Sequence, residues 1–223
     1  MFDAHRHISD CEATENALYA TSSPSEWPSL LSLGSSAVGG IGILPSEFPG
    51  DPDAVYEMLV SHPDLQIAEV GLDRRYPNGE TQRTFLAQML HMGFELGRSV
   101  SLHCVREDGL LLTVLRNERK YLPPLLWHGC TASFETIAEA VRYQVIPSYG
   151  PNIYKSNLRS RIQQILELPF ALETDFTGFE RDYAQLFANH IAAFCSLSGY
   201  SEEQLENHND EIRTILTHNT TSR

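Results

Sequence analysis

Residues 99–104 read SVSLHC, and this stretch shows the pattern on which the fold prediction rests. The apolar residues Val100 and Leu102 alternate with Ser101 and His103. Such alternation is typical of a β-strand whose two faces meet different surroundings, because successive side chains point to opposite sides. Apolar residues at helical spacing follow directly. A strand that ends in a polar residue, followed by an amphipathic helix, is therefore the unit to seek along the rest of the chain.

The same unit recurs over most of the sequence. Alternation of strands and helices predicts a parallel sheet, and seven or eight such units favour a TIM-barrel-like α/β barrel over an open sheet. The segment after Asp175 reads as loop and helix, so we expect seven clear strands with an irregular or missing eighth. The predicted strands are Phe2–His5, Val38–Leu44, Gln66–Val70, Val100–Cys104, Pro124–His128, Val145–Tyr149 and Phe170–Thr174.

Composition limits the class of protein. The length of 223 residues suits a single domain over residues 1–223. The formal net charge of -13 argues against a basic groove along DNA or an anionic membrane, although bound divalent cations can reverse the field around a small anionic substrate. The N-terminus MFDAHRHISD is too polar for a signal peptide, the four cysteines form no CxxC pair, and no apolar run approaches a membrane span. We therefore expect a cytoplasmic protein.

Metal-ligand residue types stand at the ends of the predicted strands. His5 and His7 are two apart in an extended segment, so both imidazoles point to one face. Glu69 lies in an otherwise apolar strand, where a carboxylate is costly to bury without a partner or a metal. The C-terminal strand ends form the catalytic face of such barrels. The six candidate ligands are His5, His7, Glu69, His103, His128 and Asp175.

Taken singly, each candidate has a structural explanation, such as a buried histidine, a salt-bridged glutamate or an aspartate that caps a helix. Six candidate ligands at one end of the barrel favour a centre of one or two divalent ions. These ligand types do not determine whether the ion is Zn, Mg, Mn or Ni. In the expected arrangement one ion takes His5, His7 and Asp175, the other takes His103 and His128, and Glu69 bridges them. We assign catalytic roles to Glu69 and to Asp175, which would accept the proton of an activated water.

Strand parity extends the prediction to neighbouring residues. Ser101 shares the inner face of its strand with His103, whereas Cys104 should point outward towards the helices. In the last predicted strand, Glu173 shares the inner face with Asp175, and we expect Glu173 to orient a ligand.

The motifs resemble those of the TatD family of metal-dependent hydrolases, within the amidohydrolase superfamily. The sequence DAHRH at 3–7 resembles the family's D-x-H-x-H, and EVGLD at 69–73 resembles its E-I-G-L-D. The segments LHCVR at 102–106 and HGCTA at 128–132 resemble its H-x-R and H-C-F-[ST]-G segments, and ETD at 173–175 matches its E-T-D. The resemblance implies a seven- or eight-stranded barrel, divalent metals bound by the six candidates, and hydrolysis of phosphoesters, often of DNA.

Departures from the family pattern concern the substrate more than the metals. Arg106 lies three residues after His103, where the family usually has arginine at two, and Leu44 precedes Pro45 where many members have His-Pro. A hydrolase assignment is therefore safer than a nuclease assignment. The expected partner is a phosphoester substrate, with DNA ends among the candidates. No membrane partner is expected, and a monomer is compatible with the sequence. The rim cations that could contact phosphate, or simply face solvent, are Arg74, Arg75, Arg106, Lys155 and Arg159.

Two alternatives stay open at this point. An amidohydrolase-type enzyme acting on a small amide, lactone or nucleobase would use similar ligands, but many such enzymes bridge their metals with a carboxylated lysine, and neither Lys120 nor Lys155 stands at a predicted strand end. A catalytically silent barrel that binds a partner is the other alternative.

Overall fold

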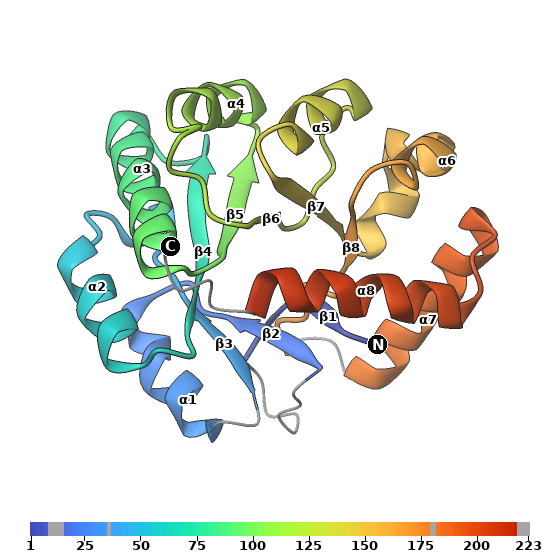
Figure 1. The fold of residues 1–223 in the computed structure, drawn as a ribbon, viewed down its shortest axis with the longest axis horizontal. Helices are drawn as coiled ribbons and strands as arrows, with labels where there is room; N and C mark the ends of the chain where they lie inside the picture. The colour runs from blue at the N-terminus through green and yellow to red at the C-terminus, as the bar shows by residue number, and fades with distance from the viewer. Residues whose placement is uncertain (9–15, 35–36, 179–181, 218–223) are drawn as a thin grey trace.

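Eight parallel strands form a nearly closed barrel with helices around it (Figure 1). The computed structural model describes residues 1–8, 16–34, 37–178 and 182–217. The strands neighbour one another in sequence order, so the predicted TIM-barrel-like fold is confirmed. The strands are β1 (Asp3–His7), β2 (Ala17–Ala20), β3 (Val38–Ile41), β4 (Gln66–Asp73), β5 (Val100–Val105), β6 (Leu125–Trp127), β7 (Val145–Tyr149) and β8 (Ala171–Leu172).

Several helix ends coincide with capping residues in the sequence. The Asp51 side chain accepts hydrogen bonds from the main chain of the first turn of α2, and Gly97 and Gly199 end α3 and α7 in the left-handed conformation. The helices are η1 (Pro24–Glu26), α1 (Trp27–Ser32), η3 (Pro45–Glu47), α2 (Pro52–Ser61), α3 (Gly79–Leu96), α4 (Asp108–Asn117), α5 (Phe134–Val141), η4 (Pro151–Lys155), η5 (Asn157–Arg161), α6 (Ile162–Ile165), α7 (Tyr183–Ser198) and α8 (Glu202–Thr217). Among the described residues, none of the helices combines the length and the apolar character of a membrane span.

The strand that the sequence did not reveal is the second and not the eighth. β2 pairs with β1 on one side and β3 on the other, and it fills the barrel position between the first two predicted strands. The last predicted strand, Phe170–Thr174, is present as the two-residue β8, which pairs with β7. The expected irregularity is therefore real, but it takes the form of a short final strand.

The seam between β8 and β1 is closed by individual hydrogen bonds. No ladder joins these two strands among the described residues. Just beyond β8, the Asp175 N–H donates to the His5 carbonyl at 3.0 Å, and the His7 N–H donates to the Phe176 carbonyl at 2.8 Å. The buried Asp3 carboxylate accepts from the Thr174 main-chain N–H at 2.9 Å and from its hydroxyl at 2.7 Å. These bonds fix β1 beside the chain segment that carries Asp175.

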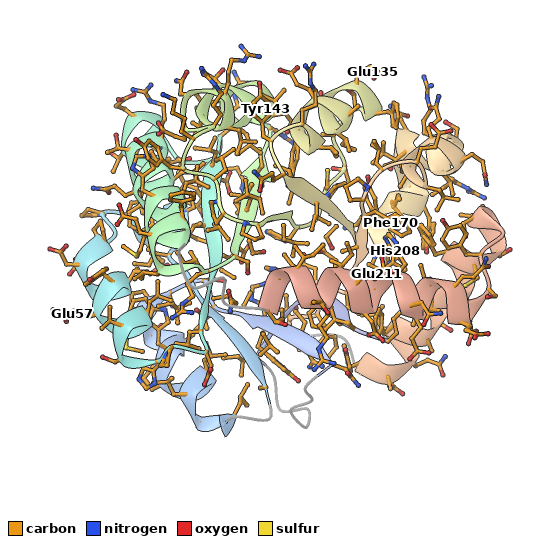
Figure 2. The ribbon with its side chains drawn as sticks, viewed as in Figure 1. Glu57, Glu135, Tyr143, Phe170, His208 and Glu211 are labelled. Carbon is orange, nitrogen blue, oxygen red and sulfur yellow. The ribbon has the colours of Figure 1, made fainter. Side chains whose placement is uncertain are left out.

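One mouth of the barrel is covered by the C-terminal helix. α8 adds Ile212 and Leu216 to the apolar cluster inside the barrel, and the Ser99 hydroxyl donates to the Leu216 carbonyl at 2.7 Å. Figure 2 shows His208 of α8 beside Phe170, and the His208 ring donates to the Phe170 carbonyl at 2.8 Å. These contacts lie at the N-terminal ends of the strands, so the candidate ligands at the C-terminal ends face the opposite mouth.

Candidate metal centre

The structure brings all six candidate ligands together at the C-terminal mouth. His5 and His7 lie on β1, Glu69 on β4 and His103 on β5, while His128 and Asp175 follow β6 and β8. The potential donor atoms form two overlapping groups, each within 4.8 Å of one another. The first group is His5, Glu69 and His128, and the second is His5, His7 and Asp175.

Glu69 lies between the two halves of the cluster. Its Oε1 is 2.7 Å from both His103 Nδ1 and His128 Nε2, and these two nitrogens are 3.2 Å apart. Its Oε2 is 3.7 Å from His7 Nε2 and accepts a hydrogen bond from Ser22 at 3.3 Å. One carboxylate oxygen thus faces each half, as a bridging ligand requires.

The other half of the cluster is built by β1 and the end of β8. His7 Nε2 lies 3.4 Å from Asp175 Oδ1. Asp175 has φ 51°, a left-handed conformation that aspartate tolerates better than most residues. The His5 ring stacks on the His128 ring with centroids 4.0 Å apart, so His5 belongs to both halves and not only to the half expected from the sequence.

The donor set fits divalent metal. Separations of 2.7–3.7 Å between ligand atoms are close to those of atoms that lie about 2.0–2.2 Å from a shared cation. The hydroxyl of Ser101 is 3.0 Å from His5 Nδ1, which leaves the buried His5 Nε2 without a hydrogen-bond partner in the described part of the chain. A buried nitrogen without a partner is costly, and a cation in this cluster would satisfy it.

The charges of the cluster suit a cation at neutral pH. Burial by itself raises the pKa of the Glu69 carboxyl, but His128 and His103 outweigh it and hold that pKa well below its usual value. Burial likewise opposes the ionised form of Asp175, and the hydrogen bond with His7 lowers its pKa overall. For His5, burial and the neighbouring His128 lower the pKa well below the usual value. Burial by itself lowers the pKa of His128, but Glu69 outweighs it and raises that pKa to about 9, so a cation would displace a proton from this ring. The site therefore offers two carboxylates and a neutral imidazole at His5, and His128 must give up its proton to bind metal.

Two glycines allow the ligand-bearing strands to approach each other. A Cβ at Gly42 would lie 1.9 Å from the Glu69 main-chain nitrogen, and a Cβ at Gly71 would lie 1.9 Å from the His103 carbonyl oxygen. Any side chain at these positions would have to displace backbone that carries a ligand.

The predictions for the neighbouring residues have different outcomes. Cys104 points away from the ligands, as expected, since its thiol contacts Asp108 Oδ1 at 3.6 Å. Glu173 is buried, and its Oε1 accepts from the Gly129 N–H at 2.5 Å, so it holds the main chain directly after His128. Burial raises the pKa of Glu173 to about 8.

Several supporting residues were missed in the sequence. The Asp3 carboxylate joins β1 to Thr174, and burial raises its pKa to about 6 although its hydrogen bonds oppose that shift. Asp73 contacts His103 Nε2 at 3.3 Å. Both aspartates belong to motifs already quoted, so their place in the pattern was a usable signal. Ser22 carried no such signal, whereas strand parity had already placed Ser101 on the inner face of its strand.

The five cations that the sequence suggested for phosphate contact differ in their partners and exposure. Arg74 lies 3.9 Å from Glu107, and Arg75 pairs with Asp73. Arg106 is exposed and adopts φ 57° after the end of β5. Lys155 and Arg159 are exposed on η4 and η5.

The barrel and its carboxylate–imidazole cluster define a hydrolase of the metal-dependent class. The profile of the family described as TatD related DNase matches residues 2–221, and the chain belongs to this family. No match was found among curated protein sequences.

Solved structures share the fold at low sequence identity. The TatD homologue YjjV from Escherichia coli K12 superposes with a TM-score of 0.77 at 20% identity, over 90% of this chain and 85% of that one. A TatD family hydrolase from Entamoeba histolytica gives 0.75 at 14%, over 92% and 85%. An uncharacterized amidohydrolase from Saccharomyces cerevisiae gives 0.70 at 13%, over 88% and 87%.

Proposed function

We propose that the protein is a metal-dependent phosphodiesterase that acts on phosphoester bonds at nucleic-acid ends. The observation that carries the proposal is the position of Glu69, whose two oxygens face the two halves of the ligand cluster. A carboxylate in this position, with imidazoles on both sides, suits a pair of divalent cations. The family description supports DNA as the substrate class.

The ligand cluster at the mouth divides into two sets, each of which would bind one cation. His103, His128 and Glu69 would hold one cation, and His7, Asp175 and Glu69 the other, with His5 between them. Divalent cations at such a site would lower the pKa of water and neutralise charge on the attacking and leaving oxygens.

Asp175 is the base of the proposed reaction. Its side chain is 44% exposed at the mouth, and the His7 contact favours its ionised form. It accepts the proton from a water whose oxygen attacks phosphorus. The phosphorus–oxygen ester bond breaks, and the leaving oxygen takes a proton from solvent.

The charge distribution favours short or single-ended substrates. A net charge of -13 disfavours long contacts along a nucleic-acid backbone. The exposed guanidinium of Arg106 directly follows β5, and the exposed ammonium of Lys155 ends η4, so both can contact one or two phosphates.

The test uses purified full-length protein, bis(p-nitrophenyl) phosphate and a 5′-labelled single-stranded oligonucleotide. We expect cleavage with Mn²⁺, Mg²⁺ or Zn²⁺, its loss with chelator, and a fall of at least 100-fold in kcat in the His128→Ala variant. His91→Ala is the matched control, because His91 is a partly buried histidine on α3 that contacts Glu118 at 2.7 Å. Activity that survives both chelation and His128→Ala would refute the proposal.

The two alternatives are outcomes of the same assay. Hydrolysis of amides or lactones without phosphoester cleavage would favour the amidohydrolase alternative, although the bridging position holds Glu69 and not a lysine. Metal binding without hydrolysis of any of these substrates would favour a silent scaffold. All six ligands are present and gathered, which speaks against loss of function.

A further inference from the structure

Asp73, at the C-terminal end of β4, divides its carboxylate between the ligand cluster and the surface. The side chain is 1% exposed. Its Oδ2 lies 3.3 Å from His103 Nε2 and also accepts from Arg75 Nε at 2.9 Å and from Arg75 Nη2, while the Arg75 main-chain N–H and Nε–H donate to its Oδ1 at 2.9 Å. The Arg75 side chain is 62% exposed at the mouth. One buried acid thus touches both an imidazole of the site and an exposed cation.

The two nitrogens of His103 have different partners. Nδ1 faces the cluster, 2.7 Å from Glu69 Oε1 and 3.2 Å from His128 Nε2. Nε2 faces Asp73. A cation in the cluster would need the lone pair of Nδ1, so in the metal-bound state the proton must lie on Nε2, where the ionised Asp73 carboxylate accepts it in a hydrogen bond. The contact with Asp73 therefore selects the tautomer of His103 that can bind a metal.

The position of Asp73 is set independently of Arg75. The buried Gln82 of α3 accepts from the Asp73 main-chain N–H at 2.7 Å and donates to the Asp73 carbonyl at 3.1 Å. Gln82 also donates to the Tyr76 carbonyl and to Asn78 Oδ1, at 3.2 and 2.7 Å, which fixes the loop between β4 and α3. Loss of the Arg75 guanidinium would leave these bonds in place.

We propose that Asp73 is a positioning residue that holds His103 in its metal-binding tautomer, and that Arg75 is not needed for this role. The inference rests on the proposed function only in taking the cluster as a metal centre. It concerns metal affinity and makes no claim about the bond that is cleaved.

The experiment is a calorimetric titration of chelator-stripped full-length protein with Zn²⁺, and again with Mn²⁺. We expect Asp73→Ala to weaken binding to the site of His103 by about 10–100-fold, the usual effect of losing a hydrogen-bond partner of a ligand. Asp73→Asn should lose less, because its carbonyl can still accept from Nε2. Arg75→Gln is the matched control and should stay within about threefold of the wild type.

Long-range ¹H–¹⁵N spectra of the zinc-loaded protein give a second readout. We expect His103 to be protonated only at Nε2 in the wild type and in Arg75→Gln. In Asp73→Ala we expect a mixture of the two tautomers. Thermal melts of the stripped proteins check folding, and Asp73→Asn carries the test if Asp73→Ala does not fold.

Equal Zn²⁺ affinity in wild type and Asp73→Ala, together with an unchanged His103 tautomer, overturns the inference; if Asp73→Ala does not fold, equal affinity in wild type and Asp73→Asn overturns it. So does an equal loss in Arg75→Gln, because the carboxylate would then act through the loop alone. A wild type that binds no Zn²⁺ or Mn²⁺ overturns the inference and the proposed function together. A wild type that binds metal but cleaves no phosphoester refutes the proposed function and leaves the role of Asp73 intact.

Discussion

Acidification should destabilise the protein through His190, a histidine of α7 that lies outside the metal centre. Its side chain is buried, with 2% of the residue exposed. Nε2 donates to the Tyr149 carbonyl at 2.8 Å, and Nδ1 lies 2.7 Å from the Tyr154 hydroxyl. Burial lowers the pKa of His190 to about 4, although the hydrogen bond to Tyr149 opposes this. The ring therefore stays neutral in the folded protein while the same residue in the unfolded chain becomes charged.

The size of the effect follows from this difference in pKa. His190 takes up a proton near its ordinary pKa of 6.5 in the unfolded chain, and only near pH 4 in the folded chain. The contribution of His190 is therefore fully present above pH 6.5 and is lost as the pH falls towards 4. The loss is about 2 kcal/mol between pH 7 and pH 5, and about 3 kcal/mol when complete, at about 1.4 kcal/mol per pKa unit.

The assay is urea denaturation of the wild type and of His190→Gln at pH 7 and pH 5. Glutamine can still donate to the Tyr149 carbonyl but carries no titratable group. Other groups titrate equally in both proteins, so we expect the wild type to lose about 2 kcal/mol more than the variant over this range. An identical pH dependence, or a His190 NMR titration near 6.5 in the folded protein, would show that burial of this ring does not act as argued.

The remaining predictions concern the barrel and its cations. Gly42→Ala should lower stability by about 1–3 kcal/mol and weaken Zn²⁺ binding, because the added Cβ overlaps the Glu69 backbone. Gly79→Ala, with open space around its Cβ, is the control and should change neither property. Equal melting temperatures and Zn²⁺ affinities in the two variants would contradict this reasoning. Thr174→Val removes one hydrogen bond to the buried Asp3 carboxylate and should cost about 1–3 kcal/mol in a urea titration, and an unchanged midpoint would count against the seam described above. Zn²⁺ at 100 times its Kd should stabilise the stripped protein by about 2.7 kcal/mol, and Glu69→Gln should lose most of this gain; a gain of the same size in the variant would exclude Glu69 as a ligand.

The fold was predictable where each strand has its own signal in the sequence. The stretch 99–104 alternates and is followed by an amphipathic helix, and β5 forms there. The β2 sequence ALYA is a run of only four residues with no alternation, so nothing in it distinguishes a strand from a loop. The closure of the barrel depends on single bonds between β1 and residues 174–176, and no periodic pattern encodes such distant pairings.

The sequence allowed the candidate ligands to be predicted, but not the residues that hold those ligands in position. Residues of ligand type can be recognised at the predicted strand ends. Because a parallel barrel places all these ends at one mouth, their convergence could be predicted as well. The pairing of His103 with Asp73, of His5 with Ser101, and the sharing of His5 between both halves depend on side-chain directions that spacing does not specify.

The central claim is that Glu69 and its neighbours hold divalent cations at this mouth. Anomalous diffraction from crystals grown with Zn²⁺ or Mn²⁺ tests it most directly. We expect two peaks about 3.5–4 Å apart, one beside His103 and His128 and the other beside His7 and Asp175, with a Glu69 oxygen towards each. Peaks confined to other parts of the surface, or no peak within about 3 Å of the Glu69 carboxylate, where a ligand oxygen should be about 2.0–2.2 Å away, would contradict the claim.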